Sequence, residues 1–341
     1  MKKDNVISLN GKWAIEYLSP EAYLSEEEAK ITDAAITVEN AVPGYFEDML
    51  DDFRKTPVYR KLSWNPTYTL HRYPIGSYCP DMTLPNPVGS FAYKRSFTLS
   101  EISGDAALYC GGVQNTLSAW INGVYLGRHE GYSAEFTLNI PNGTLRSGEN
   151  NVTLVVSNNR LAGYKERPVS GLTSRAANEC TGGIWGDVEI RFYPDGIRDV
   201  FVRISEDTSE ITVCAVGGED KDREVLLLDG NRTVRRATMK RGESRIAFSS
   251  EGMKKWSPDS PKLYKAVVKS ARQTLERRFG VRRLVTEGTK LYLNGEPYYF
   301  RGTCEHCYHP ITVHPTRDKG YYRRVLRIHL FINTRRGFEQ I

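Results

Sequence analysis

The sequence predicts a mainly β protein with more than one domain. Apolar and polar residues alternate over short runs, and turn residues separate these runs along most of the chain. Helical periodicity is almost absent before about residue 315. The length of 341 residues exceeds that of one typical domain, so two or three hydrophobic cores are expected.

Strand-like segments define the first half of the chain. They are KWAIEYL (12–18), SFAYKRSFTL (90–99), AALYC (106–110), TLSAWI (116–121), EFTLNI (135–140), NNVTLVVSN (150–158) and DVEIRFYP (187–194). Asn122-Gly123 lies between TLSAWI and VYLG, and because this dipeptide tolerates positive φ it predicts a type I′ hairpin. Together these segments indicate an all-β domain.

The segment from Pro43 to Pro87 is different, because it is rich in Tyr, Pro and Asp and has no clean period. We expect long surface loops here, and such loops often carry binding groups. The aromatic residues Trp64, Tyr68, Tyr73 and Tyr78 fit a platform that stacks on sugars, or packing of the loop against its own sandwich. Packing is favoured, since aromatic area mostly serves burial.

After FYPDG (192–196) the strand pattern restarts, which places a domain boundary near residue 195. The new strands are RDVFVRI, EITVCAV, EVLLLD, SRIAFSS and LYKAVVKS, and Asp229-Gly230 predicts a hairpin after the third. So many strands within roughly 90 residues are typical of an immunoglobulin-like sandwich. The Cys…Trp…Cys spacing of antibody domains is lacking.

The pattern changes again near Leu284. KLYLNGEPYYFRG predicts a hairpin and a further strand. A helix is expected from Asp318 to about Phe331, where Tyr322, Val325, Leu326 and His329 fall at spacings of three and four. A strand followed by a helix is the start of an α/β unit.

Composition excludes several classes of protein. The 47 Lys and Arg against 41 Asp and Glu give a net charge of +6 that is mostly dispersed, so no nucleic-acid partner is predicted. No run approaches the roughly 20 apolar residues of a membrane span. The start, MKKDNVISLNGKW, lacks the apolar core of a signal peptide. The chain as given is therefore expected in the cytoplasm, or in the periplasm or outside the cell if a leader was removed.

The stretch RGTCEHCYHP (301–310) holds the most concentrated group of reactive side chains. Cys304, His306, Cys307 and His309 are four candidate zinc ligands, but ligands at one strand end cannot all point into a tetrahedron. A redox CxxC needs its first Cys at a helix N-terminus, and Pro310 and a loop intervene before the helix. No metal and no cofactor are predicted, and free thiols are expected for the six scattered cysteines.

Several stretches together resemble glycoside hydrolase family 2, which includes β-galactosidases, β-glucuronidases and β-mannosidases. WINGVYLGRHEGYSAEFTLNI and GGIWGDVEI (182–190) are similar to its N-terminal sugar-binding jelly roll. WSPDSPKLYKAVV (256–268) is similar to the end of its immunoglobulin-like domain. RRFGVRRLVTEGTKLYLNGEPYYFRGTCEHCYHP resembles the passage into its catalytic barrel.

The resemblance implies three domains in order along the chain. Residues 1–195 would form a galactose-binding-like jelly-roll β-sandwich that binds sugar, and 196–283 an immunoglobulin-like β-sandwich. Residues 284–341 would supply the first strand and helix of an incomplete (β/α)8 barrel. A single βα unit cannot bury its own apolar face, so this last segment is expected to dock on the sandwiches or on a second copy of the chain.

The resemblance also implies substrate-binding residues. Residues just past the strand that ends in RG lie at the C-terminal face of the family's barrel, where such barrels build active sites. His306 falls on the family's histidine that approaches the sugar, and His309 on the His-Pro that follows. A neutral imidazole can donate to and accept from sugar hydroxyls. Arg175 stands near the position from which some relatives offer an aspartate to the pocket.

The catalytic residues of the family have no counterpart in this sequence. Retaining glycosidases need two carboxyl groups about 5 to 5.5 Å apart, which in this family are glutamates late in the barrel, the acid/base following an asparagine. The only Asn-Glu pair is Asn178-Glu179, before the barrel begins. The chain is therefore expected to be the non-catalytic N-terminal part of a β-galactosidase-like retaining enzyme that hydrolyses O-glycosyl bonds.

Two other functions stay open from the sequence. One is a stand-alone carbohydrate-binding module, because a β-sandwich with aromatic loops permits sugar binding. The other is a structural or interaction role for the two sandwiches. After YYRRVLRI the sequence departs from the family pattern and reads HLFINTRRGFEQI, which is expected of a truncated or frame-shifted end.

Overall fold

The computed structural model describes residues 5–20, 23, 25–64, 87–131, 134–158, 181–300 and 316–336. These residues are mainly β, which confirms the predicted fold class. They divide into two compact units, each described by itself below. One lies within 1–7, 101–107 and 190–301, and we call it the immunoglobulin-like unit; the other, the jelly-roll unit, lies within 8–100, 108–189 and 302–341.

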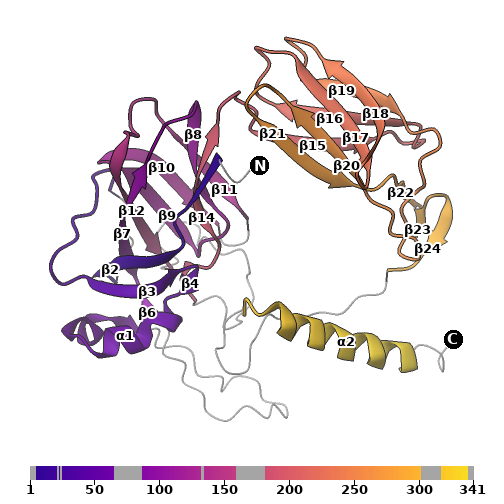
Figure 1. The fold of residues 1–341 in the computed structure, drawn as a ribbon. Helices are drawn as coiled ribbons and strands as arrows, with labels where there is room; N and C mark the ends of the chain where they lie inside the picture. Colours follow the sequence, from indigo (N-terminus) through magenta and orange to yellow (C-terminus); the bar gives the residue numbers. More distant parts are fainter. Residues whose placement is uncertain are drawn as a thin grey trace. The chain divides into compact units, whose positions relative to one another are not determined.

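The sandwich of the first half is built from two sheets (Figure 1). The larger sheet has the strand order β10-β9-β12-β7-β2-β3, with bounds β2 Gly11–Ser19, β3 Ile36–Val42, β7 Ser90–Leu99, β9 Thr116–Ile121, β10 Val124–Glu130 and β12 Gly148–Ser157. The smaller has the order β1-β14-β8-β11, with bounds β1 Val6–Ser8, β8 Asp105–Cys110, β11 Phe136–Ile140 and β14 Val188–Tyr193. All strands predicted from alternation in this half are present.

The centre of the larger sheet is buried on both faces, and strand β12 shows why. Leu154 pairs with Tyr93 and Ala119 on one face, and all three side chains are fully buried. The next residue, Val155, faces the other way and packs with Trp120. Successive strand residues point to opposite faces, so the continuous apolar run of β12 supplies both faces at once.

Asn122-Gly123 forms the predicted hairpin between β9 and β10. Ile121 and Val124 are paired across it, and both turn residues have positive φ, at 50° and 82°. This is the backbone that a two-residue type I′ turn requires.

Residues 43–64 are not the long surface loop that the sequence predicts. They form β4 Gly44–Tyr45, the 3₁₀ helices η2 Glu47–Met49 and η3 Pro57–Lys61, helix α1 Leu50–Arg54 and strand β5 Ser63–Trp64. Phe46, Met49 and Phe53 are buried, and their spacing of three and four brings them to one face of successive helical turns. The helices are only three to five residues long, too short for a helical period to be recognised in the sequence.

The immunoglobulin-like unit is a second sandwich with the predicted strands. One sheet has the order β15-β16-β19, with bounds β15 Asp199–Ile204, β16 Glu210–Val216 and β19 Arg245–Ser249. The other has the order β18-β17-β20-β21, with bounds β17 Arg223–Asp229, β18 Arg232–Met239, β20 Tyr264–Lys269 and β21 Thr274–Phe279. The predicted hairpin joins β17 to β18, where Asp229 pairs with Arg232.

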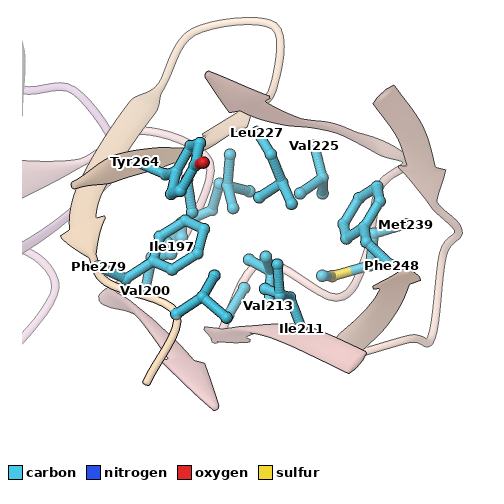
Figure 2. Close-up of a cluster of buried hydrophobic side chains, with 14 residues drawn as sticks. Ile197, Val200, Ile211, Val213, Val225, Leu227, Met239, Phe248, Tyr264 and Phe279 are labelled. Atoms are coloured by element: carbon cyan, nitrogen blue, oxygen red, sulfur yellow. The ribbon is translucent and has the colours of Figure 1, made fainter. Parts of the chain in front are cut away.

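The core of this unit lies between its two sheets. Figure 2 shows Ile211 and Val213 of β16 pointing toward Val225 and Leu227 of β17, with Phe248 beside them. Ile211, Val213, Val225 and Leu227 are fully buried. Ile211, Val213 and Ala215 are two residues apart along β16 and therefore lie on one face, so the sandwich can close around them.

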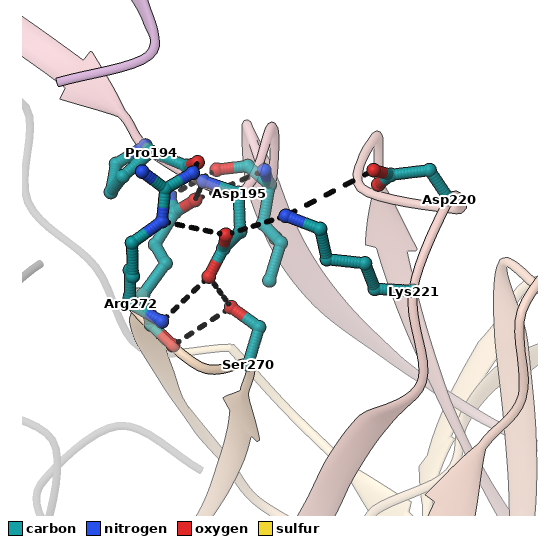
Figure 3. A network of polar contacts seen from close by, with 8 residues as sticks. Pro194, Asp195, Asp220, Lys221, Ser270 and Arg272 are labelled. Carbon is teal, nitrogen blue, oxygen red and sulfur yellow. Dashed lines mark hydrogen bonds and ion pairs between the residues drawn. The ribbon is translucent and has the colours of Figure 1, made fainter.

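A buried carboxylate organises the start of the same unit. Asp195 accepts hydrogen bonds from Ser270 Oγ at 2.7 Å, from Lys221 Nζ at 2.9 Å and from the backbone N–H of Arg272 at 2.6 Å (Figure 3). Its side chain is only 1% exposed. Burial alone raises the pKa of Asp195, but the hydrogen bonds from Ser270, Lys221 and Arg272 outweigh it and hold the pKa well below the usual range. The Asp195 side chain is therefore ionised in the folded protein.

The remaining elements are a small sheet and one long helix. The sheet has the order β22-β23-β24, with bounds β22 Leu284–Glu287, β23 Lys290–Leu293 and β24 Glu296–Tyr298, and it contains the predicted hairpin. Helix α2 spans Lys319–Arg336, close to the predicted start and longer at its end. Asp318 precedes it and accepts a hydrogen bond from the N–H of Gly320 at 2.7 Å, as an N-cap residue does. The residues predicted to continue the barrel strand lie outside the described ones.

Candidate functional site

The residues that the sequence predicts for sugar binding lie outside the described residues. These are Arg175, His306 and His309. The same holds for Asn178-Glu179 and for the alternative zinc or redox cysteines Cys304 and Cys307. The roles of these residues therefore stay predictions. The structure does describe the framework that bounds residues 65–86 and 159–180, and this framework is the candidate site.

A short ladder joins the two ends of residues 65–86. Strand β5 pairs with β6 (Pro87–Val88), so that Trp64 lies opposite Pro87 and Ser63 opposite Val88. Trp64 and Pro87, the residues that flank 65–86, are thus fixed next to each other.

Asn158 connects this ladder to the end of β12. Its Nδ2 donates to the carbonyl oxygen of Pro87 at 2.8 Å, and its Oδ1 accepts from the N–H of Gly89 at 2.9 Å. The residue is only 3% exposed. Because a buried amide group is expensive to leave unpaired, these two bonds fix the chain on both sides. The first residue before 159–180 is therefore tied to the first residues after 65–86.

The other end of 159–180 is tied to the same place through Gln114 and Asn115. The backbone of Gln114 exchanges hydrogen bonds with Gly183, with N···O distances of 3.0 and 3.3 Å. Asn115 donates its backbone N–H to Ser157 at 2.8 Å and its Nδ2 to the carbonyl of Asn158 at 3.3 Å. We call Ser63–Trp64, Pro87–Gly89, Gln114–Asn115, Ser157–Asn158 and Gly182–Gly183 the loop frame, because these residues hold the flanks of 65–86 and of 159–180 together.

Close backbone approach explains why the frame uses consecutive glycines. Strand β13 (Gly183–Ile184) pairs with β4, and Phe46 donates its N–H to the carbonyl of Gly182 at 2.8 Å. A Cβ on Gly182 would lie 2.3 Å from the Phe46 ring, and one on Gly183 would lie 2.6 Å from the Gly44 oxygen. Gly183 also has φ +120°, a conformation that only glycine adopts readily.

Acidic residues of η2 lie near this frame and affect a buried tyrosine. Tyr93 is fully buried, and its hydroxyl has no hydrogen-bond partner among the described residues. Burial, followed by the negative charges of Glu47 and Asp48, raises the pKa of Tyr93 well above its ordinary value. Tyr93 therefore stays neutral. Asp48 accepts the N–H of Tyr45 at 2.9 Å, which links η2 to β4.

The described residues offer no metal centre. Within the described ranges, no three His, Cys, Asp or Glu side chains gather in a way that could hold an ion. Cys110 and Cys214 are free thiols, as predicted for the chain. Burial, opposed only by a hydrogen bond from the Gly112 backbone, raises the pKa of Cys110 to about 12, so this thiol is protonated and unreactive.

The loop frame consists of amide and backbone groups that bond to one another, and it fixes the residues that flank 65–86 and 159–180. Asn158 is not among the residues that the sequence predicts for the site. The available signal was an asparagine directly after a fully buried strand, in LVVSN, where a polar side chain at the strand end has carbonyls and N–H groups within reach.

Two family models match consecutive parts of the chain. "Glycosyl hydrolases family 2, sugar binding domain" matches residues 6–190, and "Glycosyl hydrolases family 2" matches residues 196–282. Two successive domains, the first matched by the sugar-binding model, define the class of protein as one built from glycosyl hydrolase family domains. The chain belongs to glycosyl hydrolase family 2, as the sequence motifs predicted.

Curated relatives include β-galactosidases that are much longer than this chain. The β-galactosidase of Arthrobacter sp. (strain B7) is 26% identical over 312 residues, which cover 88% of this chain and 29% of the relative. That of Staphylococcus xylosus is 25% identical over 316 residues, covering 90% of this chain and 29% of the relative. The chain thus spans 29% of the length of these two relatives.

Solved structures of β-glucuronidases share the fold. The enzyme of Bifidobacterium dentium, complexed with coumarin-3-O-glucuronide, has a TM-score of 0.69 and 19% identity, covering 96% of this chain and 56% of that one. The Faecalibacterium prausnitzii enzyme has a TM-score of 0.68 and 21% identity, covering 95% and 54%. The likeness confirms the sandwich architecture. Among the described helices, none is both long and apolar enough to cross a membrane.

Proposed function

We propose that these 341 residues are the non-catalytic N-terminal part of a family 2 glycosidase and do not hydrolyse glycosides by themselves. The parent reaction would be β-galactosidase-like hydrolysis of an O-glycosyl bond with retention, through a covalent glycosyl-enzyme. The observation that carries the proposal is the match of two successive domains, 6–190 and 196–282, to the sugar-binding and following domains of this family.

The content of residues 284–341 supports the lack of activity. A (β/α)8 barrel takes roughly 250 residues, and this segment is a small fraction of that. Its described residues form one small sheet and helix α2. A retaining mechanism needs two facing carboxyl groups on such a barrel.

The role of the loop frame follows from the same proposal. By fixing the ends of residues 65–86 and 159–180, it would present these segments, Arg175 included, to a sugar bound at the barrel of a full-length enzyme. His306 and His309 would contact the same sugar from the barrel side. The domains would be 1–195, 196–283 and 284–341, the last docking on the sandwiches or on a second copy of the chain.

An activity assay tests the proposal directly. The purified chain is separated by size exclusion, and each fraction is assayed with aryl β-galactosides, β-glucuronides and β-mannosides. We expect no turnover in the fractions that contain the folded chain. Turnover that follows the main protein peak would overturn the proposal. The same elution profile reports whether the chain is a monomer or an oligomer.

Calorimetry distinguishes the alternative of a stand-alone carbohydrate-binding module. The chain is titrated with a panel of β-linked oligosaccharides and with their component monosaccharides. Under the proposal most sugar contacts belong to the barrel, so flat titrations are expected. Saturable heat with an oligosaccharide would favour the binding module, and loss of that heat in an Arg175→Ala variant would place the site at residues 159–180.

A further inference from the structure

Four Asn-Gly dipeptides occur in the sequence, and the structure distinguishes one of them. They are Asn10-Gly11, Asn122-Gly123, Asn142-Gly143 and Asn294-Gly295. An asparagine followed by glycine can modify itself, because the backbone nitrogen of glycine is unhindered and can reach the side-chain carbonyl carbon. We propose that Asn142 is the site of this spontaneous deamidation in the folded protein, and that the other three asparagines are protected.

In three of the four dipeptides the side-chain amide is fixed at both ends. Each donates through Nδ2 and accepts through Oδ1, at distances of 2.8 to 3.0 Å. The partners are Asp187 and Val188 for Asn10, Thr144 and Asn151 for Asn122, and Trp256 and Arg283 for Asn294. Attack by the following nitrogen requires the side chain to rotate, so both bonds must first break.

The backbone adds protection at two of these sites. Asn122 and Asn294 both have positive φ, at 50° and 56°, and each begins a tight turn between paired strands. Cross-strand pairing on both sides of such a turn restricts the change of backbone angles that ring closure demands.

Asn142 differs in each respect. It is exposed, and among the residues that the structure describes its side chain has no hydrogen-bond partner. Its turn is held by one backbone bond, from the N–H of Thr144 to the carbonyl of Pro141 at 3.1 Å. Around Gly143, as around Gly295, no atom beyond the glycine and its two chain neighbours lies within 4 Å of the position where a Cβ would be. Neither the Asn142 side chain nor the attacking backbone nitrogen of Gly143 is obstructed.

The reaction needs only water and balances as follows. The Gly143 nitrogen loses its proton to solvent base and attacks Cγ of Asn142, forming a C–N bond. The bond from Cγ to Nδ2 breaks, and ammonia leaves with a proton from solvent. Water then opens the five-membered succinimide at either carbonyl, giving aspartate or isoaspartate. The product carries a negative charge and lowers the formal net charge of +6 by one.

Peptide mapping by mass spectrometry after incubation in mildly alkaline buffer tests the proposal. We expect Asn142 to convert at least roughly tenfold faster than each of the other three, because breaking two hydrogen bonds slows the others by that order. Isoaspartate at Asn142 would be detected by methyl transfer to it from a repair methyltransferase. Conversion of Asn10, Asn122 or Asn294 at the rate of Asn142 would overturn the proposal.

Two controls make the comparison specific to the fold. In concentrated guanidinium chloride all four dipeptides lose their partners, so their rates should agree within a few fold; persistent selectivity there would show that local sequence, not structure, sets the rate. In an Asn142→Gln variant the fast-forming acidic species on isoelectric focusing should disappear, because glutamine would have to close a larger ring. Its persistence would also contradict the assignment.

Discussion

Arg272 holds Asp195 through its backbone and its side chain at once. The backbone N–H donates to Oδ2 at 2.6 Å and Nε donates to Oδ1 at 3.2 Å, while the guanidinium also donates to the carbonyl of Pro194. Gln273, the next residue, accepts the N–H groups of Asp195 and Ile197 through its Oε1 at 3.3 and 3.1 Å. The chain entering the second sandwich is thus fixed by the turn that precedes β21.

Asp195→Asn should destabilise the immunoglobulin-like unit. An amide cannot accept from all of the donors that surround the carboxylate, so buried N–H groups lose their partner. We expect the free energy of unfolding to fall by about 2 to 4 kcal/mol, because each buried donor left without an acceptor costs about 1 to 3 kcal/mol. Urea denaturation followed by the fluorescence of Trp256 would measure the change.

A surface pair in the same unit provides the control for Asp195. Lys265 and Glu276 lie 2.8 Å apart on neighbouring strands, and both are considerably exposed. Glu276→Gln should change the free energy of unfolding by less than about 1 kcal/mol. Equal effects of the two substitutions would contradict the importance given to burial at Asp195.

Acid should weaken the unit through the same carboxylate. The pKa of Asp195 is lower in the folded state than the value of about 3.9 expected when unfolded. A depressed folded pKa stabilises the protein above the unfolded pKa, and this contribution is lost as the pH falls below about 4 toward the folded pKa. We expect Tm to drop over this window more steeply for the wild type than for Asp195→Asn.

Asp207 also contributes to the dependence of Tm on pH in that experiment. Hydrogen bonds from Ser205 and Ser209 lower the pKa of Asp207 to about 2, so acid also affects this exposed turn. The contribution is common to the wild type and the Asp195→Asn variant, and the difference between their two Tm profiles therefore isolates Asp195. Parallel profiles below pH 4 would rule out the linkage at Asp195.

Leu227→Ala should leave a cavity between the two sheets of the same sandwich. Leu227 is fully buried in the cluster drawn in Figure 2. Truncating a buried leucine costs about 2 to 5 kcal/mol, depending on how far the neighbours relax. Leu263, which is 44% exposed, is the matched control, and Leu263→Ala should change stability by no more than about 0.5 kcal/mol. Chemical denaturation of both variants would measure the two changes in the free energy of unfolding.

The sequence predicted the strands better than it predicted the elements between them. Strands such as β7 and β12 show long apolar or alternating runs in the sequence. The hairpin at Asn122-Gly123 was predictable because this dipeptide tolerates the positive φ angles that the turn requires. The one-turn helices within residues 47–61 have no such signal, because their burial comes from packing such as Phe53 against Phe91, at a ring-centroid separation of 5.8 Å. A contact between residues so far apart in sequence leaves no periodic trace.

The loop frame could not be predicted for a related reason. Its bonds join residues near 44, 88, 115, 158 and 183, and only the folded sandwich brings these together. The family resemblance placed candidate residues beyond the frame, at Arg175, His306 and His309, but gave no reason to single out Asn158. Its importance is visible only once its amide is seen between Pro87 and Gly89.

Asn158→Ala should open the loop frame. The substitution leaves the carbonyl of Pro87 and the N–H of Gly89 without their partner in a buried place. Each unpaired buried group is expensive, so we expect a loss of about 2 to 4 kcal/mol and a faster exchange of the Gly89 amide hydrogen, by roughly tenfold or more. Hydrogen exchange with fragment mass spectrometry or NMR would follow this amide.

Asn151→Ala is the control that separates the frame from general effects on β12. Asn151 lies on the same strand, and its Oδ1 accepts a hydrogen bond from Ser96 in an exposed position. Removing that bond should change stability by no more than about 0.5 kcal/mol and leave the Gly89 amide protected. Two outcomes would contradict the role of Asn158: equally fast exchange of the Gly89 amide in both variants, or a Gly89 amide that stays protected in Asn158→Ala. In either case neighbouring groups or water could replace the two hydrogen bonds of Asn158, and Asn158 would not be the residue that fixes the two segments.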